Sequence, residues 1–292
     1  MNIVSIYKQY PTEADCIAHL EKVKWPDNQP VCPYCSSKKA TPLPKEYRYH
    51  CNNCNTTFSV TVGTIFHHTH LPLQKWFLAI SLILNAKKGI AARQLARDLE
   101  VNKNTAWYLA MRIRKAMIET KQRELLQGIV EMDETYIGGK PRKGIARDNY
   151  KRGRGTSKIP VVGMAERDGN VKAKVIYSHK LDNRTLSSLV RENVDTSHTR
   201  LITDEYTGYI GMARIVKHEV VNHQVWYVDG DRHTNTIEGF WALLKRGIVG
   251  QYHKVSVKHL NKYIDEFCYR YNNRECQDLF ALTISRGLAI TY

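Results

Sequence analysis

Two closely spaced pairs of cysteines constrain the fold of this chain more than any other feature. Cys32 and Cys35 form the first pair and Cys51 and Cys54 the second, in the pattern C-x2-C-x15-C-x2-C. Each pair suits a tight turn, and two such turns can close a tetrahedral site around one Zn²⁺. Four unrelated thiols would not need this spacing, and a redox CxxC pair would need one motif in a βαβ setting. The spacing predicts a zinc ribbon over residues 28–62, preceded by an N-terminal segment 1–27, with one structural Zn²⁺ supplying much of its folding free energy.

The charge balance indicates a polyanionic partner. The 292 residues include 44 Lys and Arg against 28 Asp and Glu, a formal net charge of +16. Such an excess opposes compaction and favours nucleic acid or an anionic membrane. The membrane alternative lacks a run of about 18 apolar residues, and the N-terminus lacks the basic and apolar regions of a signal peptide. We therefore expect a nucleic-acid-binding protein of the cell interior, with no membrane association.

A second module, residues 73–121, has the pattern of a helix-turn-helix. After an apolar helix, a short helix over 91–99 and a longer one over 103–117 flank a turn, in which Asn102 is a suitable N-cap. The second helix would enter the major groove with its early residues near base edges. The alternative is a helical hairpin without DNA contacts. The candidate base contacts are Lys103, Asn104, Thr105, Trp107 and Tyr108, and the candidate phosphate contacts are Arg112, Arg114 and Lys115.

The third module, residues 128–274, predicts an α/β domain in which a sheet is covered by helices. A helix is expected before the fourth strand, another from residue 234, and an amphipathic helix near the end, followed by a C-terminal tail over 275–292. The expected strands are 128–139, 157–169, 170–179 and 199–205, and a further helix over 205–215 and a strand over 216–223 follow them.

A glycine-rich basic loop, residues 138–158, separates the first two strands. This composition cannot fold alone and predicts a mobile segment that contacts DNA, although a solvated loop is the alternative. Its candidate DNA contacts are Lys140, Arg142, Lys143, Lys151, Arg152 and Arg154.

Three acidic residues carry the predicted chemistry, namely Asp133, Asp204 and Glu238. Asp204 follows a short apolar run that predicts a strand end, and Glu238 lies 34 positions later on an expected helix. Glu131 and Asp133 alternate with apolar residues, so a strand would turn both to one face. Such carboxylates are the oxygen ligands that Mg²⁺ prefers, and two ions can stabilise an in-line phosphoryl displacement. Surface acids and helix caps are the alternative interpretation of these residues.

Several segments together resemble insertion-sequence transposases of the IS1595 family of bacteria and archaea, with an ISXO2-like catalytic domain. They cover nearly the whole chain and are CPYC…CNNC, GIAARQLARDLEVNKNTAW, MDETYIGGK, LITDEYTGY, HTNTIEGFWALLKRG and YIDEFCYRYNNR. The resemblance implies a DDE transposase with a ribonuclease H-like core. Asp133, Asp204 and Glu238 match the catalytic acids, and Lys245 matches a basic residue of the family. Seven residues are almost two helical turns, so Glu238 and Lys245 share a helix face and the lysine can reach phosphate.

This resemblance implies an enzyme that binds the terminal inverted repeats of an insertion sequence in double-stranded DNA. Two Mg²⁺ ions (or Mn²⁺) would support strand cleavage and then transfer of the released 3′-OH into target DNA. We expect a homodimer or higher oligomer on DNA, in the cytoplasm and nucleoid of a prokaryotic cell. His223, His233 and Asn235 border the expected site, where they would contact substrate or serve structural roles.

The sequence is also compatible with three alternative functions. A DNA-binding regulator would need no carboxylate triad. A structure-selective nuclease, such as a junction resolvase, would cut DNA without joining a 3′-OH to a target. A co-opted transposase would bind DNA without moving it. Metal-dependent nicking and strand transfer distinguish these functions.

Overall fold

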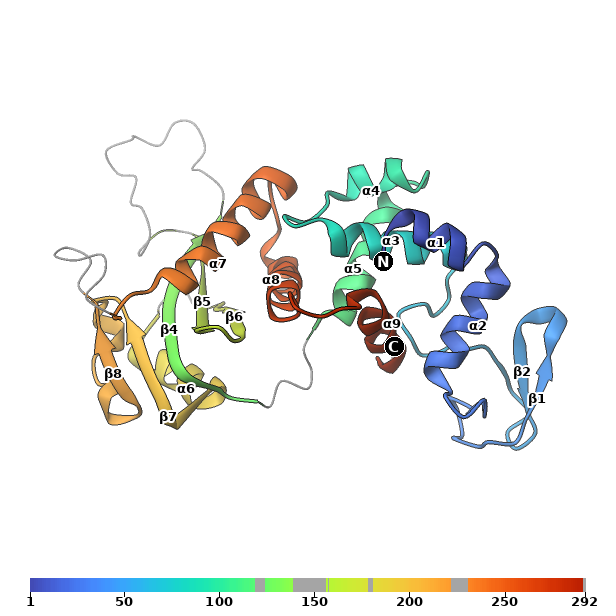
Figure 1. The fold of residues 1–292 in the computed structure, drawn as a ribbon, viewed down its shortest axis with the longest axis horizontal. Helices are drawn as coiled ribbons and strands as arrows, with labels where there is room; N and C mark the ends of the chain where they lie inside the picture. Colours follow the sequence, from blue (N-terminus) through green and yellow to red (C-terminus); the bar gives the residue numbers. More distant parts are fainter. Residues whose placement is uncertain (119–123, 139–155, 157, 178–180, 222–230, 291–292) are drawn as a thin grey trace. The chain divides into compact units, whose positions relative to one another are not determined.

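The computed structural model describes residues 1–118, 124–138, 156, 158–177, 181–221 and 231–290. Within it the chain divides into two compact units (Figure 1). Unit 1 combines Met1–Ile118 with Glu275–Tyr292, and unit 2 is Glu119–Arg274. In the sequence, unit 2 is therefore an insertion within unit 1. No helix in the described part of the chain has the length and apolarity needed to span a membrane.

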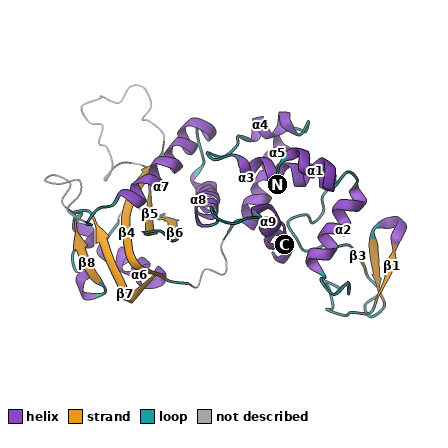
Figure 2. Cartoon of the chain, viewed as in Figure 1, coloured by secondary structure: helices purple, strands orange, loops and turns teal. Residues whose placement is uncertain are grey.

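Unit 1 is a helical body joined to a three-stranded antiparallel ribbon (Figure 2). The first 24 residues form two helices, of which the second starts with a capping box between Thr12 and Asp15. The helices are α1 Ile3–Gln9, α2 Glu13–Lys24, α3 Leu73–Asn85, α4 Ala92–Asp98, α5 Lys103–Ala116 and α9 Leu279–Ala289. The ribbon strands are β1 Ala40–Leu43, β2 Arg48–Cys51 and β3 Thr57–Phe58, with a short 3-10 turn, η1, at Pro44–Glu46.

The C-terminal residues differ from the expected tail. They form α9, whose Phe280, Ile284 and Leu288 are buried at four-residue intervals on one face. This face packs against α2, α3 and α5. Gly287 is part of the joint, because a Cβ there would lie 2.6 Å from the Ile65 side chain. Residues 275–292 are thus part of unit 1, since their spacing of apolar side chains has a partner surface there.

The predicted helix pair of unit 1 is present. α4 and α5 are joined by residues 99–102, and Asn102 caps α5 by accepting a hydrogen bond from the backbone N–H of Asn104 at 2.9 Å. Ala106 and Leu109 turn inward from α5, whereas the first residues of the helix are exposed. The sequence therefore predicted the local structure of this segment correctly.

Unit 2 contains a five-stranded sheet in the order β6-β5-β4-β7-β8. β4, β5 and β6 are antiparallel neighbours, whereas β7 is parallel to β4 and β8 is parallel to β7. This order and direction are those of a ribonuclease H-like fold, which confirms the predicted α/β core. The strands are β4 Leu126–Ile137, β5 Ile159–Glu166, β6 Val171–Val175, β7 Val194–Thr203 and β8 Lys217–Val220.

Helices cover the two faces of this sheet. Alternate residues of β4, Val130 and Met132, pack in a core with Leu186 and Val190 of α6 (Asn183–Asn193). The other face of β4 contacts α7 (Asn235–Arg246). Successive side chains of a strand point to opposite faces, so α6 and α7 lie on opposite sides of the sheet. The acids of β4 that face α7 are therefore separated from the apolar core under α6.

Further elements complete unit 2 around this core. Two 3-10 turns, η3 Thr207–Tyr209 and η4 Met212–Arg214, follow β7. After α7 the chain continues through a π-helical turn, η5 Gly247–Tyr252, into α8 Val257–Asn272. The side chain of Asn272 on α8 pairs with both backbone groups of Val171, at 2.7 and 3.0 Å. α8 thereby covers the edge strand β6, which would otherwise expose unpaired backbone groups.

Candidate active site

Three carboxylates converge where β4 and β7 run side by side. Asp133, Glu134 and Asp204 each offer one oxygen atom, and these three atoms lie within 4.8 Å of one another. The cause is the parallel register, which places Met132 beside Thr203 and so brings the residues that follow them together. Two of the three acids predicted from the sequence therefore meet across about 70 residues of chain. We call Asp133, Glu134 and Asp204 the carboxylate cluster.

Glu134 was not predicted as a site residue. Its side chain is 8% exposed and accepts a hydrogen bond at 2.8 Å from the hydroxyl of Tyr209, which is also buried. Burial beside Glu134 raises the pKa of Tyr209 well above its ordinary value, so the phenol keeps its proton and remains a donor. The only signal in the sequence was the position of Glu134 next to Asp133, and alternation along the strand argued for the opposite face.

Glu238 lies outside the carboxylate cluster. It is in the first turn of α7, is exposed, and accepts a hydrogen bond from the hydroxyl of Thr234 at 2.8 Å. Its charge still reaches the cluster, because it is among the causes of the raised pKa of Asp133. The structure therefore sets the third predicted acid at the border of the cluster, on a helix, and the first two within it.

The electrostatics of Asp133 suit a cation site. Burial is the largest cause that raises its pKa to about 7, and the charges of Glu134, Asp204 and Glu238 add to it. One of its oxygens, Oδ2, accepts a hydrogen bond from the indole N–H of Trp241 at 3.0 Å. Several anionic oxygens crowded together repel one another, and a divalent ion relieves this repulsion. The cluster consists of hard oxygen donors, so Mg²⁺ or Mn²⁺ fits it.

Glu131 shares the face of Asp133, as the alternation predicted, but it does not join the cluster. Its carboxylate is fully buried and contacts the start of α7 and Arg167. His233 is half-buried beside it, with its Nδ1 atom 3.2 Å from Oε1 of Glu131. His233 therefore lies against the buried end of α7. The sequence predicted only the strand face of Glu131, and its role comes from these tertiary contacts.

The remaining predicted residues of this region lie on α7 or outside the described part of the chain. Asn235 and Lys245 are exposed on α7, in its first and last turns. His223 lies outside the described residues, and so do the basic-loop positions Lys140, Arg142, Lys143, Lys151, Arg152 and Arg154.

The four cysteines of the ribbon form a second potential metal site. One sulfur atom from each lies within 4.8 Å of the others. The Sγ atoms of Cys35 and Cys51 are 3.5 Å apart, and those of Cys32 and Cys54 are 3.7 Å apart. A tetrahedron with Zn–S bonds of about 2.3 Å needs sulfurs about 3.8 Å apart. The four residues therefore fit one structural Zn²⁺ without rearrangement.

The thiols of this cysteine site are unequal. The pKa of Cys51 is lowered to about 6, mainly by a hydrogen bond from the backbone of Cys54. The pKa of Cys54 is also lowered, mainly by a hydrogen bond with the side chain of Thr56. Burial raises the pKa of Cys32 to about 11. Zinc binds thiolates. The lowered pKa values of Cys51 and Cys54 favour this form before the metal binds, whereas Cys32 must lose its proton when the ion binds.

The predicted DNA contacts on α5 divide into two groups. Lys103, Asn104 and Thr105 are exposed, and Trp107 and Tyr108 are 39% and 51% exposed. The prediction for Arg112 and Arg114 is wrong, because they are only 4% and 2% exposed.

The contacts of Arg112 explain why the predicted phosphate contact is wrong. Its Nη2 atom donates to the carbonyl of His67 at 2.6 Å, and its guanidinium lies 5.4 Å from the ring centres of both Trp76 and Tyr108. The positive charge of Arg112 is therefore paired with a carbonyl oxygen and two aromatic rings inside unit 1, and it does not face solvent. Arg112 is therefore structural. Lys115, the remaining predicted phosphate contact on α5, is half-buried.

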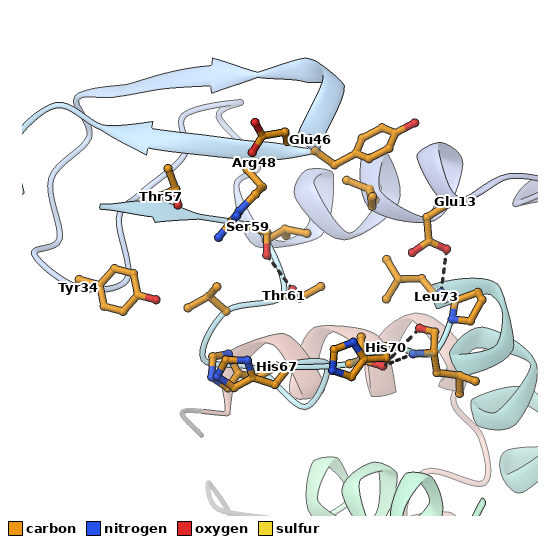
Figure 3. Close-up of a pocket in the computed structure, with 18 residues that line it drawn as sticks. Glu13, Tyr34, Glu46, Arg48, Thr57, Ser59, Thr61, His67, His70 and Leu73 are labelled. Atoms are coloured by element: carbon orange, nitrogen blue, oxygen red, sulfur yellow. Dashed lines mark hydrogen bonds between the residues drawn. The ribbon is translucent and has the colours of Figure 1, made fainter. Parts of the chain in front are cut away.

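Unit 1 also contains a hollow of about 470 Å³ between the ribbon and the helices, with a mixed polar and apolar lining (Figure 3). Arg48 enters from the ribbon, and His67 and His70 lie on the connection to α3. On its wall, Glu13 of α2 accepts a hydrogen bond from the backbone N–H of Leu73 at 2.8 Å. In the described residues, these histidines do not form a metal-ligand group of three. The ribbon, α2 and the connection to α3 thus all contribute residues to its wall.

Comparisons with known proteins agree with this geometry. Residues 125–272 match the model of the ISXO2-like transposase domain, and residues 11–57 match that of the transposase zinc-ribbon domain. A protein of the transposable element ISH50 from Halobacterium salinarum is 29% identical over 279 residues, which are 90% of this chain and 92% of the relative.

Two solved structures were also matched. The pre-cleavage Mos1 transpososome is 15% identical, with a TM-score of 0.29, over 73% of this chain and 78% of the other. The Mos1 strand transfer complex is 14% identical, with the same TM-score, over 72% and 78%. Likenesses of this extent do not define a function.

Proposed function

The chain belongs to the ISXO2-like transposase family, and we propose that it binds the terminal inverted repeats of an insertion sequence, cuts there, and joins the released 3′-OH to target DNA. The observation that carries this proposal is the convergence of Asp133, Glu134 and Asp204 at neighbouring strands of a ribonuclease H-like sheet. A regulator that only binds DNA does not need such a crowded, partly buried group of acids. Their electrostatic cost is offset when they hold divalent ions.

Asp133 and Asp204 would hold two Mg²⁺ or Mn²⁺ ions, and Glu238 would complete the ligand set from α7. When bound, the ions supply stabilisation of the attacking and leaving oxygens in phosphoryl transfer. Trp241 restrains one oxygen of Asp133 by its hydrogen bond and so leaves Oδ1 for a ligand role. Lys245, exposed two turns beyond Glu238, would bind a DNA phosphate alongside.

Recognition of the element's ends is assigned to unit 1. The exposed start of α5 carries Lys103, Asn104 and Thr105 together with the two half-exposed aromatic residues that follow. Such a surface suits base edges and phosphates in a major groove. The zinc ribbon would support this surface, and the basic loop would contact flanking or target DNA. Joining two ends requires two active sites, so we propose a homodimer or higher oligomer on DNA.

Cleavage and joining are tested on duplex DNA that carries the ends of the source element. Purified protein with Mg²⁺ or Mn²⁺ is expected to nick the substrate at the end and to join the 3′-OH to a second duplex. Asp204→Ala should abolish both reactions while binding of the duplex, measured by fluorescence anisotropy, stays within about twofold. Nicking without joining would favour a structure-selective nuclease. Binding without either reaction would contradict the proposal.

A further inference from the structure

The start of α7 is capped by a side chain from another element. Oε2 of Glu131 on β4 accepts the backbone N–H groups of Thr236 at 2.7 Å and Ile237 at 3.1 Å, and Oε1 accepts the hydroxyl of Thr236 at 3.0 Å. The first N–H groups of a helix have no partner within the helix, and an anion there also interacts favourably with the helix dipole. Glu131 thus serves α7 as a cap across 105 positions of sequence.

Thr234, the residue that would normally provide this cap, makes a different hydrogen bond. Thr234 occupies the N-cap position but makes no side-chain cap bond to the helix backbone. Its hydroxyl instead donates to Oε1 of Glu238 at 2.8 Å. Because Glu131 satisfies the helix start, Thr234 can orient the predicted third ligand.

A cation on a third element neutralises the buried Glu131. Nε of Arg167 lies 2.8 Å from Oε1 of Glu131, and its Nη2 donates to the carbonyl of His233 at 3.0 Å. The backbone N–H of Arg167 is bonded to Ile129 on β4 at 3.0 Å. Burying a carboxylate costs free energy unless it is paired and hydrogen-bonded in this way. β4, the turn after β5 and the start of α7 are therefore tied through one carboxylate.

A second attachment lies one helical turn along α7. Trp241 donates to Asp133, which is two residues from Glu131 on the same strand face. Two residues of strand span about 6.7 Å, and four residues of helix, from Ile237 to Trp241, span about 6 Å. The spacing of the two attachment points is therefore similar on the strand and on the helix, and α7 is held along β4 at both points. Glu238 lies on the helix between them.

From this arrangement we infer that Glu131 is a positioning residue, which fixes α7 so that Glu238 is held beside Asp133 and Asp204. Glu131 does not contact the reacting atoms, and its effect on the site passes through Glu238. The inference rests on the proposed role of Glu238 as a metal ligand. If Glu131 were purely structural, its substitution would lower the stability of unit 2, and its effect on metal binding would not depend on Glu238.

The test is a double-mutant cycle read by metal affinity in the full-length protein. Mn²⁺ binding is measured from the electron paramagnetic resonance signal of the free ion, for wild type, Glu131→Gln, Glu238→Gln and the double variant. Each single variant is expected to weaken Mn²⁺ binding by about 10-fold or more, the range typical of residues that orient metal ligands. The double variant is expected to bind within about twofold of Glu238→Gln alone, because Glu131 acts through that residue.

Glu266→Gln provides the matched control. Glu266 is also fully buried in unit 2 and paired with an arginine, Arg270, at 2.9 Å, but it is on α8. Its loss should leave Mn²⁺ affinity unchanged despite a similar change to a buried ion pair. Urea unfolding of each variant checks that it is folded. Thr236→Val, which removes only the hydroxyl bond to Glu131, replaces Glu131→Gln in the cycle if the latter does not fold.

The outcomes separate the two ideas. Unchanged affinity in Glu238→Gln would remove Glu238 from the ligand set, and the proposed role of that residue would fail together with the inference. A loss in Glu238→Gln without a loss in Glu131→Gln would overturn the positioning role alone. Losses that multiply in the double variant would also overturn it, because Glu131 would then act independently of Glu238.

Discussion

Trp241 on α7 and Asp133 on β4 are joined by a 3.0 Å hydrogen bond from the indole N–H to Oδ2. The helix that carries the predicted third acid thus also restrains the first. A tryptophan in this position has two functions, since its ring is 3% exposed and packs against the sheet while its N–H reaches a carboxylate.

Trp241→Phe should separate these two functions. The change keeps most of the buried ring but removes the donor to Asp133, so we expect Mn²⁺ affinity and the rate of strand cleavage to fall by about 10-fold. Unfolding free energy should fall by about 1–3 kcal/mol, as for a lost bond to a charged group. Trp107→Phe, at an exposed position of α5, is the control and should change neither metal affinity nor stability.

Gly163 on β5 permits the close approach of α7. It pairs with Asp133 across the sheet, and a Cβ there would lie 2.6 Å from the ring of Trp241 and 2.9 Å from Ile237. Gly163→Ala should destabilise unit 2 by about 1–3 kcal/mol through overpacking and reduce cleavage. Gly239→Ala on α7 has open space and should be neutral or stabilising by up to about 1 kcal/mol. Equal effects of the two substitutions in urea unfolding would contradict the predicted contact.

The metal-free protein should lose stability as the pH rises from about 4 to about 8. The pKa of Asp133 is raised from 3.8 to about 7, so the folded state binds its proton more tightly than the unfolded state does. This contribution is complete below pH 3.8 and is lost as the pH passes 7, by up to about 4 kcal/mol. Urea unfolding in EDTA at pH 5 and pH 8 measures it.

Asp133→Asn isolates this contribution, because asparagine does not titrate. The difference in unfolding free energy between wild type and Asp133→Asn should change with pH in the direction given, and added Mn²⁺ should restore wild-type stability at pH 8. A difference that is constant between pH 5 and pH 8 would show that the Asp133 carboxyl has an ordinary pKa.

Removal of zinc should affect unit 1 and spare the carboxylate cluster. Cys51→Ala deletes the thiol with the most favoured thiolate and should reduce bound zinc from one ion per chain to none. We expect loss of end-DNA binding with retention of Mn²⁺ affinity, measured by elemental analysis, anisotropy and paramagnetic resonance. Cys276→Ala, at an exposed cysteine outside the ribbon, is the control. Retention of one zinc ion by the Cys51 variant would contradict the four-cysteine site.

Phe280→Ala should destabilise unit 1 although it lies beyond unit 2 in the sequence. Phe280 is 2% exposed and contacts Phe77 of α3 with ring centres 5.6 Å apart. The substitution should cost about 3–5 kcal/mol, as for other buried phenylalanines. Hydrogen exchange should show faster opening of α2, α3 and α5, with unchanged protection in β4 and β7. Unchanged protection in α3 would mean that the C-terminal helix is dispensable.

The sequence alone determined the features that depend on neighbours along the chain. Cysteine spacing defined the ribbon, Asn102 marked the start of α5, and alternation in β4 gave Glu131 and Asp133 a common face. These predictions succeed because turn chemistry, capping and strand periodicity are local properties.

Only the tertiary structure decided how these elements are used. The parallel pairing of β4 with β7 brought Glu134 into the cluster, and α5 turned Arg112 inward where its charge suggested DNA. The cap that Glu131 provides to α7 joins residues 105 positions apart. Such partnerships are set by which faces pack and in which register. The spacing of apolar residues in the sequence shows which side chains share a face of a helix or strand, but it does not show which other element will pack against that face.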